Sequence, residues 1–90
     1  MRYMVIETYP HGPAVVYERV AARGRMLPPG LDYVASWTDE RTLDRCFQLM
    51  ETEQPSLLEE WIASWRDIVE FEVVPVISSG EAAARARRPA

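Results

Sequence analysis

The side chains best suited to chemistry in this sequence include a cysteine, a glutamine and a tryptophan in two neighbouring predicted strands. Residues two apart lie on the same face of a strand, so Cys46 and Gln48 share one face. With Trp37 beside them, the thiol could react, the amide could orient a polar ligand and the indole could stack on a planar one. The alternative is an interface core in which Cys46 acts as a small hydrophobic residue and Gln48 satisfies its amide across the interface. The sequence places no base beside Cys46, so a nucleophilic role has little support.

The remaining candidates are one carboxylate and one imidazole. If Glu7 points to the same side as Tyr3 and Val5, burial would raise its pKa and make it a candidate acid or base. Alternatively it lies at the end of its strand, in water or paired to an arginine. His11 is the only histidine and could serve as a haem ligand or a general base. Its alternative is a surface position in a turn, beside a proline and a glycine.

Composition limits the function classes. A chain of 90 residues with 48% hydrophobic content is expected to form one globular domain. Its net charge of −4 argues against general nucleic-acid binding. No apolar run approaches the roughly 18 residues of a membrane helix, and no signal peptide is visible, so the expected location is the cytoplasm. A single cysteine allows no internal disulfide and no thiolate metal cluster, and the sequence assigns neither a metal nor a cofactor.

Hydrophobic periodicity predicts the elements that must position these residues. Strands alternate in hydrophobicity, helices repeat at three and four residues, and proline or glycine marks most boundaries. Proline suits the first position of each predicted helix because no backbone donor is needed there. The predicted elements are strand 3–9, helix 13–23, strand 33–38, strand 45–51, a helix from about residue 55, and strand 69–77.

The order β-α-β-β-α-β predicts an α+β, ferredoxin-like fold, in which two helices cover one face of a four-stranded antiparallel sheet. This domain should span residues 1–80, and an Ala/Arg-rich tail should follow at residues 81–90. Pro75 lies in the last strand, so that strand is expected at an edge. Ser78 and Glu81 form a possible capping box, which could start a short helix in the tail.

The predicted strands are apolar on both faces, whereas two helices can cover only one. We expect Trp37 to pair with Cys46, Ala35 with Gln48 and Tyr33 with Met50, a register that a slip of one residue would change. In that register the helices cover one set of side chains and leave the other bare. The set expected under the helices is Met4, Ile6, Phe47 and Leu49, and the set expected to be bare is Val5, Tyr33, Trp37, Cys46 and Met50.

Five segments resemble a family of short bacterial proteins of unknown function. They are residues 23–28 (RGRMLP), 33–37 (YVASW), 45–52 (RCFQLMET), 61–65 (WIASW) and 71–76 (FEVVPV). The resemblance implies membership of the dimeric α/β-barrel superfamily, in which two ferredoxin-like subunits press their open sheet faces together. That superfamily includes cofactor-free monooxygenases, haem-degrading enzymes and members without known activity, and it transfers no catalytic residue to this chain.

Three functions are therefore open. The first is a homodimer that binds a small apolar or aromatic molecule, with Glu7, Trp37 and Gln48 as polar groups of the pocket. The second is a cofactor-independent monooxygenase-like enzyme, which rests on analogy with the fold alone. The third is a non-catalytic dimerisation module with a filled barrel. An exposed apolar sheet face favours a homodimer in each case, because monomers rarely expose a contiguous apolar patch above a few hundred Å².

Overall fold

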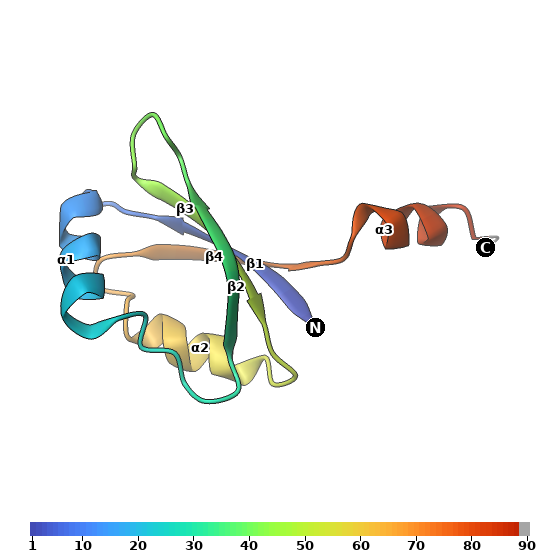
Figure 1. Cartoon of the computed structure of the whole chain (residues 1–90), viewed down its shortest axis with the longest axis horizontal. Helices are drawn as coiled ribbons and strands as arrows, with labels where there is room; N and C mark the ends of the chain where they lie inside the picture. Colours follow the sequence, from blue (N-terminus) through green and yellow to red (C-terminus); the bar gives the residue numbers. More distant parts are fainter. Residues whose placement is uncertain (89–90) are drawn as a thin grey trace.

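Four strands pair into one antiparallel sheet in the order β2-β3-β1-β4, and α1 and α2 lie on one side of it (Figure 1). The computed structural model describes residues 1–88. This is the predicted ferredoxin-like α+β arrangement, with one further helix after the last strand. The elements are β1 (Arg2–Thr8), α1 (Pro13–Arg23), β2 (Asp32–Thr38), β3 (Arg45–Glu51), α2 (Ser56–Ala63), β4 (Glu70–Val76) and α3 (Ser79–Ala86).

The start and the end of α1 follow from its local sequence, and the apolar spacing of α2 sets which side of it faces the sheet. Pro13 occupies the start of α1, and Gly24 ends the helix with φ of 66°, a conformation that glycine adopts without strain. In α2 the buried residues Leu58, Trp61 and Ile62 recur at helical spacing and face the sheet. β4 forms an edge of the sheet, as Pro75 within it predicted.

The helices cover the opposite face of the sheet from the one expected. In β1 the buried residues are Tyr3, Val5 and Glu7, whereas the residues between them are only half buried. Cys46, Gln48 and Met50 are likewise buried in β3, so they lie under the helices with Val5 and Glu7. The prediction that helices would cover Met4, Ile6, Phe47 and Leu49 is wrong. Because β1 is apolar on both sides, its alternation could not decide which side the helices would take.

A bulge in β2 changes the predicted register. Tyr33 pairs with Met50 as expected, but the register then shifts, so that Ala35 pairs with Leu49 and Trp37 with Phe47. The predicted pairs of Trp37 with Cys46 and of Ala35 with Gln48 are therefore wrong. The extra residue in the bulge turns Trp37 to the face away from the helices, where 57% of it is exposed.

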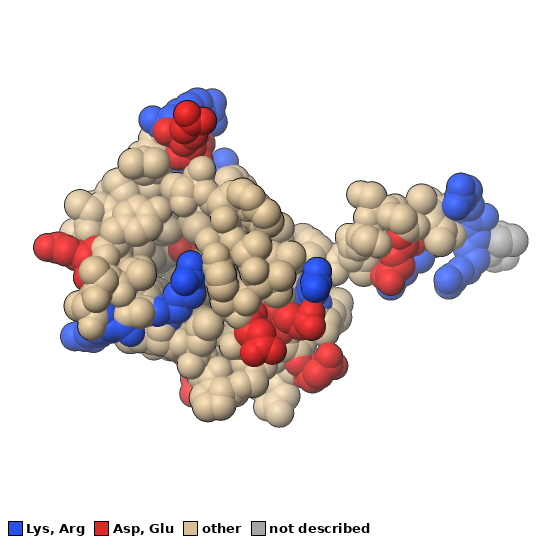
Figure 2. All heavy atoms as spheres, viewed as in Figure 1, with Lys and Arg blue, Asp and Glu red and all other residues tan. Residues whose placement is uncertain are grey.

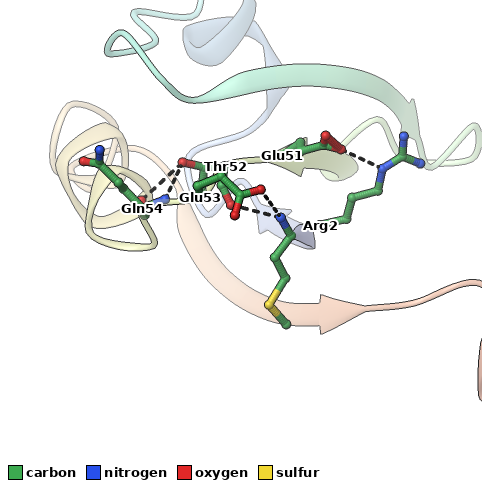
Figure 3. A network of polar contacts seen from close by, with 6 residues as sticks. Arg2, Glu51, Thr52, Glu53 and Gln54 are labelled. Atoms are coloured by element: carbon green, nitrogen blue, oxygen red, sulfur yellow. Dashed lines mark hydrogen bonds and ion pairs between the residues drawn. The ribbon is translucent and has the colours of Figure 1, made fainter. Parts of the chain in front are cut away.

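The start of β1 is tied to the end of β3. The Met1 amino group donates to the Thr52 carbonyl and to Glu53 Oε1, each at 3.2 Å, and Arg2 Nε donates to Glu51 Oε2 at 3.0 Å (Figure 3). The Thr52 hydroxyl in turn accepts from the backbone N–H of Gln54 at 3.0 Å. These contacts fix the corner from which the chain enters α2.

The last helix stands apart from the rest of the chain, and the sheet lies between it and α1 (Figure 1). Ser78 caps α3 and accepts from the backbone N–H of Glu81 at 3.1 Å, as the sequence pattern predicted. Every described residue of α3 is exposed. The helix therefore begins two residues before the predicted tail, of which residues 89 and 90 lie outside the described part of the chain.

Candidate functional site

A cavity of about 90 Å³ lies between α1 and the covered face of the sheet. The space-filling view shows a hollow on this side, with both acidic and basic atoms visible in it (Figure 2). The volume exceeds the 10–15 Å³ or so that one water occupies, and it is below the roughly 300 Å³ of a pocket for a drug-sized ligand. The lining residues are Glu7, Tyr9, Val16, Tyr17, Val20, Arg25, Ser36, Thr38, Cys46, Gln48, Trp61 and Trp65.

Glu7 is the carboxylate of this cavity, and two side chains bind it from the sheet. Tyr9 Oη donates to Glu7 Oε1 at 3.0 Å, and Gln48 Nε2 donates to Glu7 Oε2. Only 5% of Glu7 is exposed, and this burial raises its pKa against the opposing effects of both hydrogen bonds and of the nearby Arg25. The site therefore favours a protonated carboxyl more than water does.

Arg25 reaches the same cluster from the loop after α1. Its Nε donates to Gln48 Oε1 at 3.3 Å, and its guanidinium lies 3.8 Å from the centre of the Tyr33 ring. The indole N–H groups of Trp61 and Trp65 both donate to the Arg25 carbonyl, at 2.8 and 3.1 Å. Two buried tryptophans of the α2 region thus hold the backbone of the residue that brings a positive charge to the cavity.

Cys46 is a buried, neutral group of the same cavity. Burial raises the pKa of its thiol, and the Glu7 charge raises it further, against the opposing contacts with Tyr9 and Thr38 and the charge of Arg25. Burial and the Glu7 charge also raise the pKa of Tyr9. A thiolate is the nucleophilic form of cysteine, so this environment disfavours nucleophilic chemistry at Cys46.

The hydroxyl-bearing residues Tyr17, Ser36 and Thr38 also line the cavity, and the Tyr33 hydroxyl lies next to that of Ser36. The Tyr17 and Thr38 hydroxyls lie 3.1 Å apart, and those of Tyr33 and Ser36 lie 2.8 Å apart. The Tyr17 ring also meets the Tyr9 ring edge to face, at 6.3 Å between centroids. The cavity therefore combines aromatic walls with hydroxyl, amide, carboxyl and guanidinium groups.

Residues 1–89 match a family model described as "Domain of unknown function (DUF3303)". The chain belongs to this family. The match confirms the predicted resemblance to a family of unknown function. No curated protein and no solved structure matches the DUF3303 chain at a significant level.

In this DUF3303 domain, three of the five residues selected from the sequence lie together. Glu7, Cys46 and Gln48 line the cavity, although on the face that was expected to be bare. Trp37 lies on the opposite face, and His11 is exposed in the turn between β1 and α1. Neither of these two lines the cavity.

Sequence reasoning missed Tyr9 and Arg25 as members of the cluster. Tyr9 follows Glu7 by two residues and so shares its face, which was a usable signal. Arg25 carried no signal, because its place depends on the carbonyl contacts with Trp61 and Trp65 across the fold.

A second, larger hollow lies between α2 and β4. Its volume is about 540 Å³, and its lining includes Tyr3, Leu58, Ile62, Phe71 and Val73. It is a more open groove, and no buried polar side chain lies in it. The smaller cavity therefore has the stronger claim to specific chemistry.

Two findings concern other classes of site. The described residues contain no group of three or more histidine, cysteine, aspartate or glutamate side chains arranged to hold a metal ion. No helix among the described residues is long and apolar enough to cross a membrane.

Proposed function

We propose that this chain is a homodimeric protein that binds a small molecule with an apolar or aromatic body in the Glu7 cavity. The observation that carries the proposal is the convergence of Glu7, Gln48 and Arg25 in a cavity whose other walls are mostly aromatic and aliphatic. The Ser36 and Thr38 hydroxyls and the Cys46 thiol complete the lining. Pockets for small molecules combine an apolar lining with a few placed polar groups in this way. Burial of a carboxylate costs stability, which a function in binding would explain.

Ligand-dependent melting shifts test the pocket. A panel of single-ring aromatic fragments is screened against the wild type, Glu7→Gln and Gln48→Ala. Glu72→Gln is the matched control, because Glu72 is exposed and lies on the other face of the sheet. Fragments that stabilise the wild type should stabilise the control equally and Gln48→Ala less. If both cavity variants respond as the wild type does, this site assignment is wrong.

The uncovered face of the sheet supports the homodimer. Its centre is mostly apolar, with Glu72 beside Ile6 as the one charged side chain there. The apolar residues are Met4, Ile6, Ala35, Trp37, Phe47, Leu49 and Val74. Seven-residue strands in a four-stranded sheet give a face of about 23 by 19 Å, or on the order of 400 Å². Each partner of a standard interface buries about 800 Å², so contact between two such sheet faces supplies roughly half of the area that a stable interface buries. α3, which stands clear of its own subunit, is the segment that would add contact area.

Sedimentation velocity at micromolar concentration tests the assembly. The wild type should sediment as a dimer, and Phe47→Asp should sediment as a folded monomer because it buries a charge in the sheet interface. Val15→Asp, at an exposed apolar position on α1, is the control and should stay dimeric. Deletion of residues 79–90 should weaken the dimer without unfolding the chain. A wild type that sediments as a monomer would refute the homodimer, and it would leave the proposal of a binding pocket standing.

An enzyme is the second candidate, favoured by the buried Glu7 with its raised pKa, since such groups act as acids or bases. The cofactor-independent monooxygenase activity implied by the resemblance remains an analogy of fold. Oxygen consumption with each fragment that binds would test it. Turnover that Glu7→Gln abolishes, with fragment binding retained, would favour the enzyme over the binding protein.

A further inference from the structure

We propose that the ligand is a small monocarboxylic acid, whose carboxylate binds Arg25 while Glu7 holds a proton. This inference rests on the proposed binding function and names the chemical class of the ligand.

Arg25 lines the cavity without a carboxylate partner among the described residues. Other arginines of the chain have one: Arg19 pairs with Asp67, and Arg41 with Asp39. Arg25 instead stacks on Tyr33 and uses only Nε, which donates to the Gln48 amide. A guanidinium has five N–H donors in a fixed fork that matches a carboxylate, so Arg25 retains donors for a ligand.

The Gln48 amide sets the relation between Arg25 and Glu7. Its oxygen accepts from Arg25 and its nitrogen donates to Glu7, so the amide separates the two ionisable groups. The groups that face Glu7 are Tyr9 on its own strand and Gln48 and Cys46 on β3, together with the charge of Arg25 from the loop. Arg25 is the only one of these that is cationic, so no second positive charge offsets an anion at the site.

Charge balance then links the ligand to the proton. With Glu7 ionised, the site already balances the Arg25 charge, and a second carboxylate would be repelled at short range. With Glu7 protonated, the charge of Arg25 is unbalanced in a partly buried place, which favours one anion. A ligand carboxylate and a proton on Glu7 therefore bind together.

The walls of the cavity select the rest of the ligand. Val16, Val20 and Trp65 line it, with Tyr9 and Trp61. A single cation suits a single negative charge, whereas a phosphate would bring more charge and more acceptors than one guanidinium can satisfy. The volume of about 90 Å³ limits the enclosed part to about one ring or a short chain. A monocarboxylate with one ring fits both limits.

Calorimetric titration with benzoate, and with benzamide as its neutral counterpart, tests the proposal. Benzoate should bind the wild type at pH 5.5 and lose affinity as the pH rises. Above the pKa that Glu7 has in the ligand-free protein, the affinity should fall by at most about tenfold per pH unit. Titrations in two buffers of different ionisation enthalpy should show proton uptake. Benzamide should bind at least tenfold more weakly at pH 5.5.

Three variants separate the roles of the residues. Arg25→Gln should weaken benzoate about tenfold to a hundredfold, because a charged hydrogen-bond partner is lost, and should leave benzamide unchanged. Arg23→Gln is the control, because Arg23 is exposed at the end of α1, and it should bind as the wild type does. Glu7→Gln should bind benzoate with no pH dependence and without proton uptake. If Arg25→Gln does not fold, Arg25→Lys should still bind benzoate, but more weakly.

The failures of the two proposals are distinguishable. Equal binding of benzoate and benzamide, with shifts in the Trp61 and Trp65 indole NMR signals, would overturn the acid class and keep the pocket. Benzoate binding that Arg25→Gln does not weaken would also overturn it. If neither probe moves the indole signals, and no fragment of the panel does so, both the ligand class and the binding function are wrong.

Discussion

The two faces of the sheet differ in what they contain and in what covers them. The face beneath α1 and α2 buries a carboxyl, an amide and a thiol at Glu7, Gln48 and Cys46. The other face is mostly apolar at its centre, and none of the described helices covers it (Figure 1). The buried polar groups all have hydrogen-bond partners, since no buried side-chain nitrogen or oxygen among the described residues lacks one. The buried polar groups therefore lie on the covered face alone, which is why the proposed pocket is placed there and the proposed dimer contact on the open face.

The largest expected difference between the two faces is in the stability lost when a tryptophan is removed from each. Trp61 is 2% exposed and donates to the Arg25 carbonyl, so Trp61→Ala should lower the free energy of unfolding by about 3–5 kcal/mol. Trp37→Ala should change it by less than about 0.5 kcal/mol in dilute protein, because Trp37 lies on the open face. Urea unfolding at two protein concentrations measures both changes.

Measuring stability at two protein concentrations sharpens the comparison between Trp61 and Trp37. Wild-type stability should rise with protein concentration if a second copy covers the open face, and Trp37→Ala should reduce this gain. Trp61→Ala should destabilise the chain equally at both concentrations. A large loss for Trp37→Ala in dilute protein would show that the indole stabilises its own subunit, and the contrast between the faces would fail.

The next largest expected effect is on the rate at which a cysteine on each face reacts with a thiol reagent. Cys46 is 7% exposed beneath the helices, and burial raises its pKa, so a thiol reagent should modify it on the order of a hundredfold more slowly than it modifies the unfolded chain. In a Cys46→Ala background, Leu49→Cys places the only thiol on the open face. That thiol should react quickly in dilute protein and slowly at concentrations where the proposed dimer would form. Stopped-flow labelling across a dilution series measures both rates.

The sequence predicted the order of elements well because periodicity and proline placement are local. It could not predict which face the helices take, since β1 offers an apolar set on either side. The face was decided by tertiary contacts, such as those of Glu7 with Tyr9 and Gln48. Trp37 was misplaced because a bulge adds one residue to β2, and nothing in the alternation of that strand marks the bulge.

The site was predictable to a similar extent. Residue type and parity placed Glu7, Cys46 and Gln48 in one group, since strand parity holds on whichever face is buried. Arg25 was not predictable, because the two tryptophans that hold its carbonyl lie more than thirty residues away in the chain.

The pH dependence of stability gives a smaller effect on the covered face. Burial raises the pKa of Glu7 above its ordinary 4.5, so between that value and the folded-state pKa the native chain holds more protons than the unfolded chain. Stability should therefore fall as the pH rises through this window, by at most about 1.4 kcal/mol per pH unit. Glu7→Gln should remove this slope, whereas the open-face variant Glu72→Gln should keep it. Urea titrations at half-unit pH steps measure the slope.

The smallest expected effect on stability concerns the ion pair between α1 and the segment after α2; α1 and α2 are the two helices that cover the sheet. Arg19 of α1 donates to both carboxylate oxygens of Asp67 after α2, at 2.8 and 2.7 Å, and so joins the two helices over the covered face. The Arg19 hydrogen bonds lower the pKa of Asp67 from 3.8 to about 2. A lowered pKa stabilises the fold above the unfolded value, and this contribution is lost as the pH falls from 3.8 towards 2.

Asp67→Asn should therefore be less stable than the wild type at pH 6 and should approach it near pH 2. The difference should be small, because the pair is exposed to solvent and screened by salt. Glu60→Gln, on the exposed side of α2, should run parallel to the wild type over the same range. Because this pair joins α1 to the segment after α2 on the covered side of the sheet, Asp67→Asn should leave the proposed dimer unchanged in sedimentation. A weaker dimer in that variant would mean that the covered and open faces are coupled through the sheet, and the two could then no longer be treated as separate surfaces.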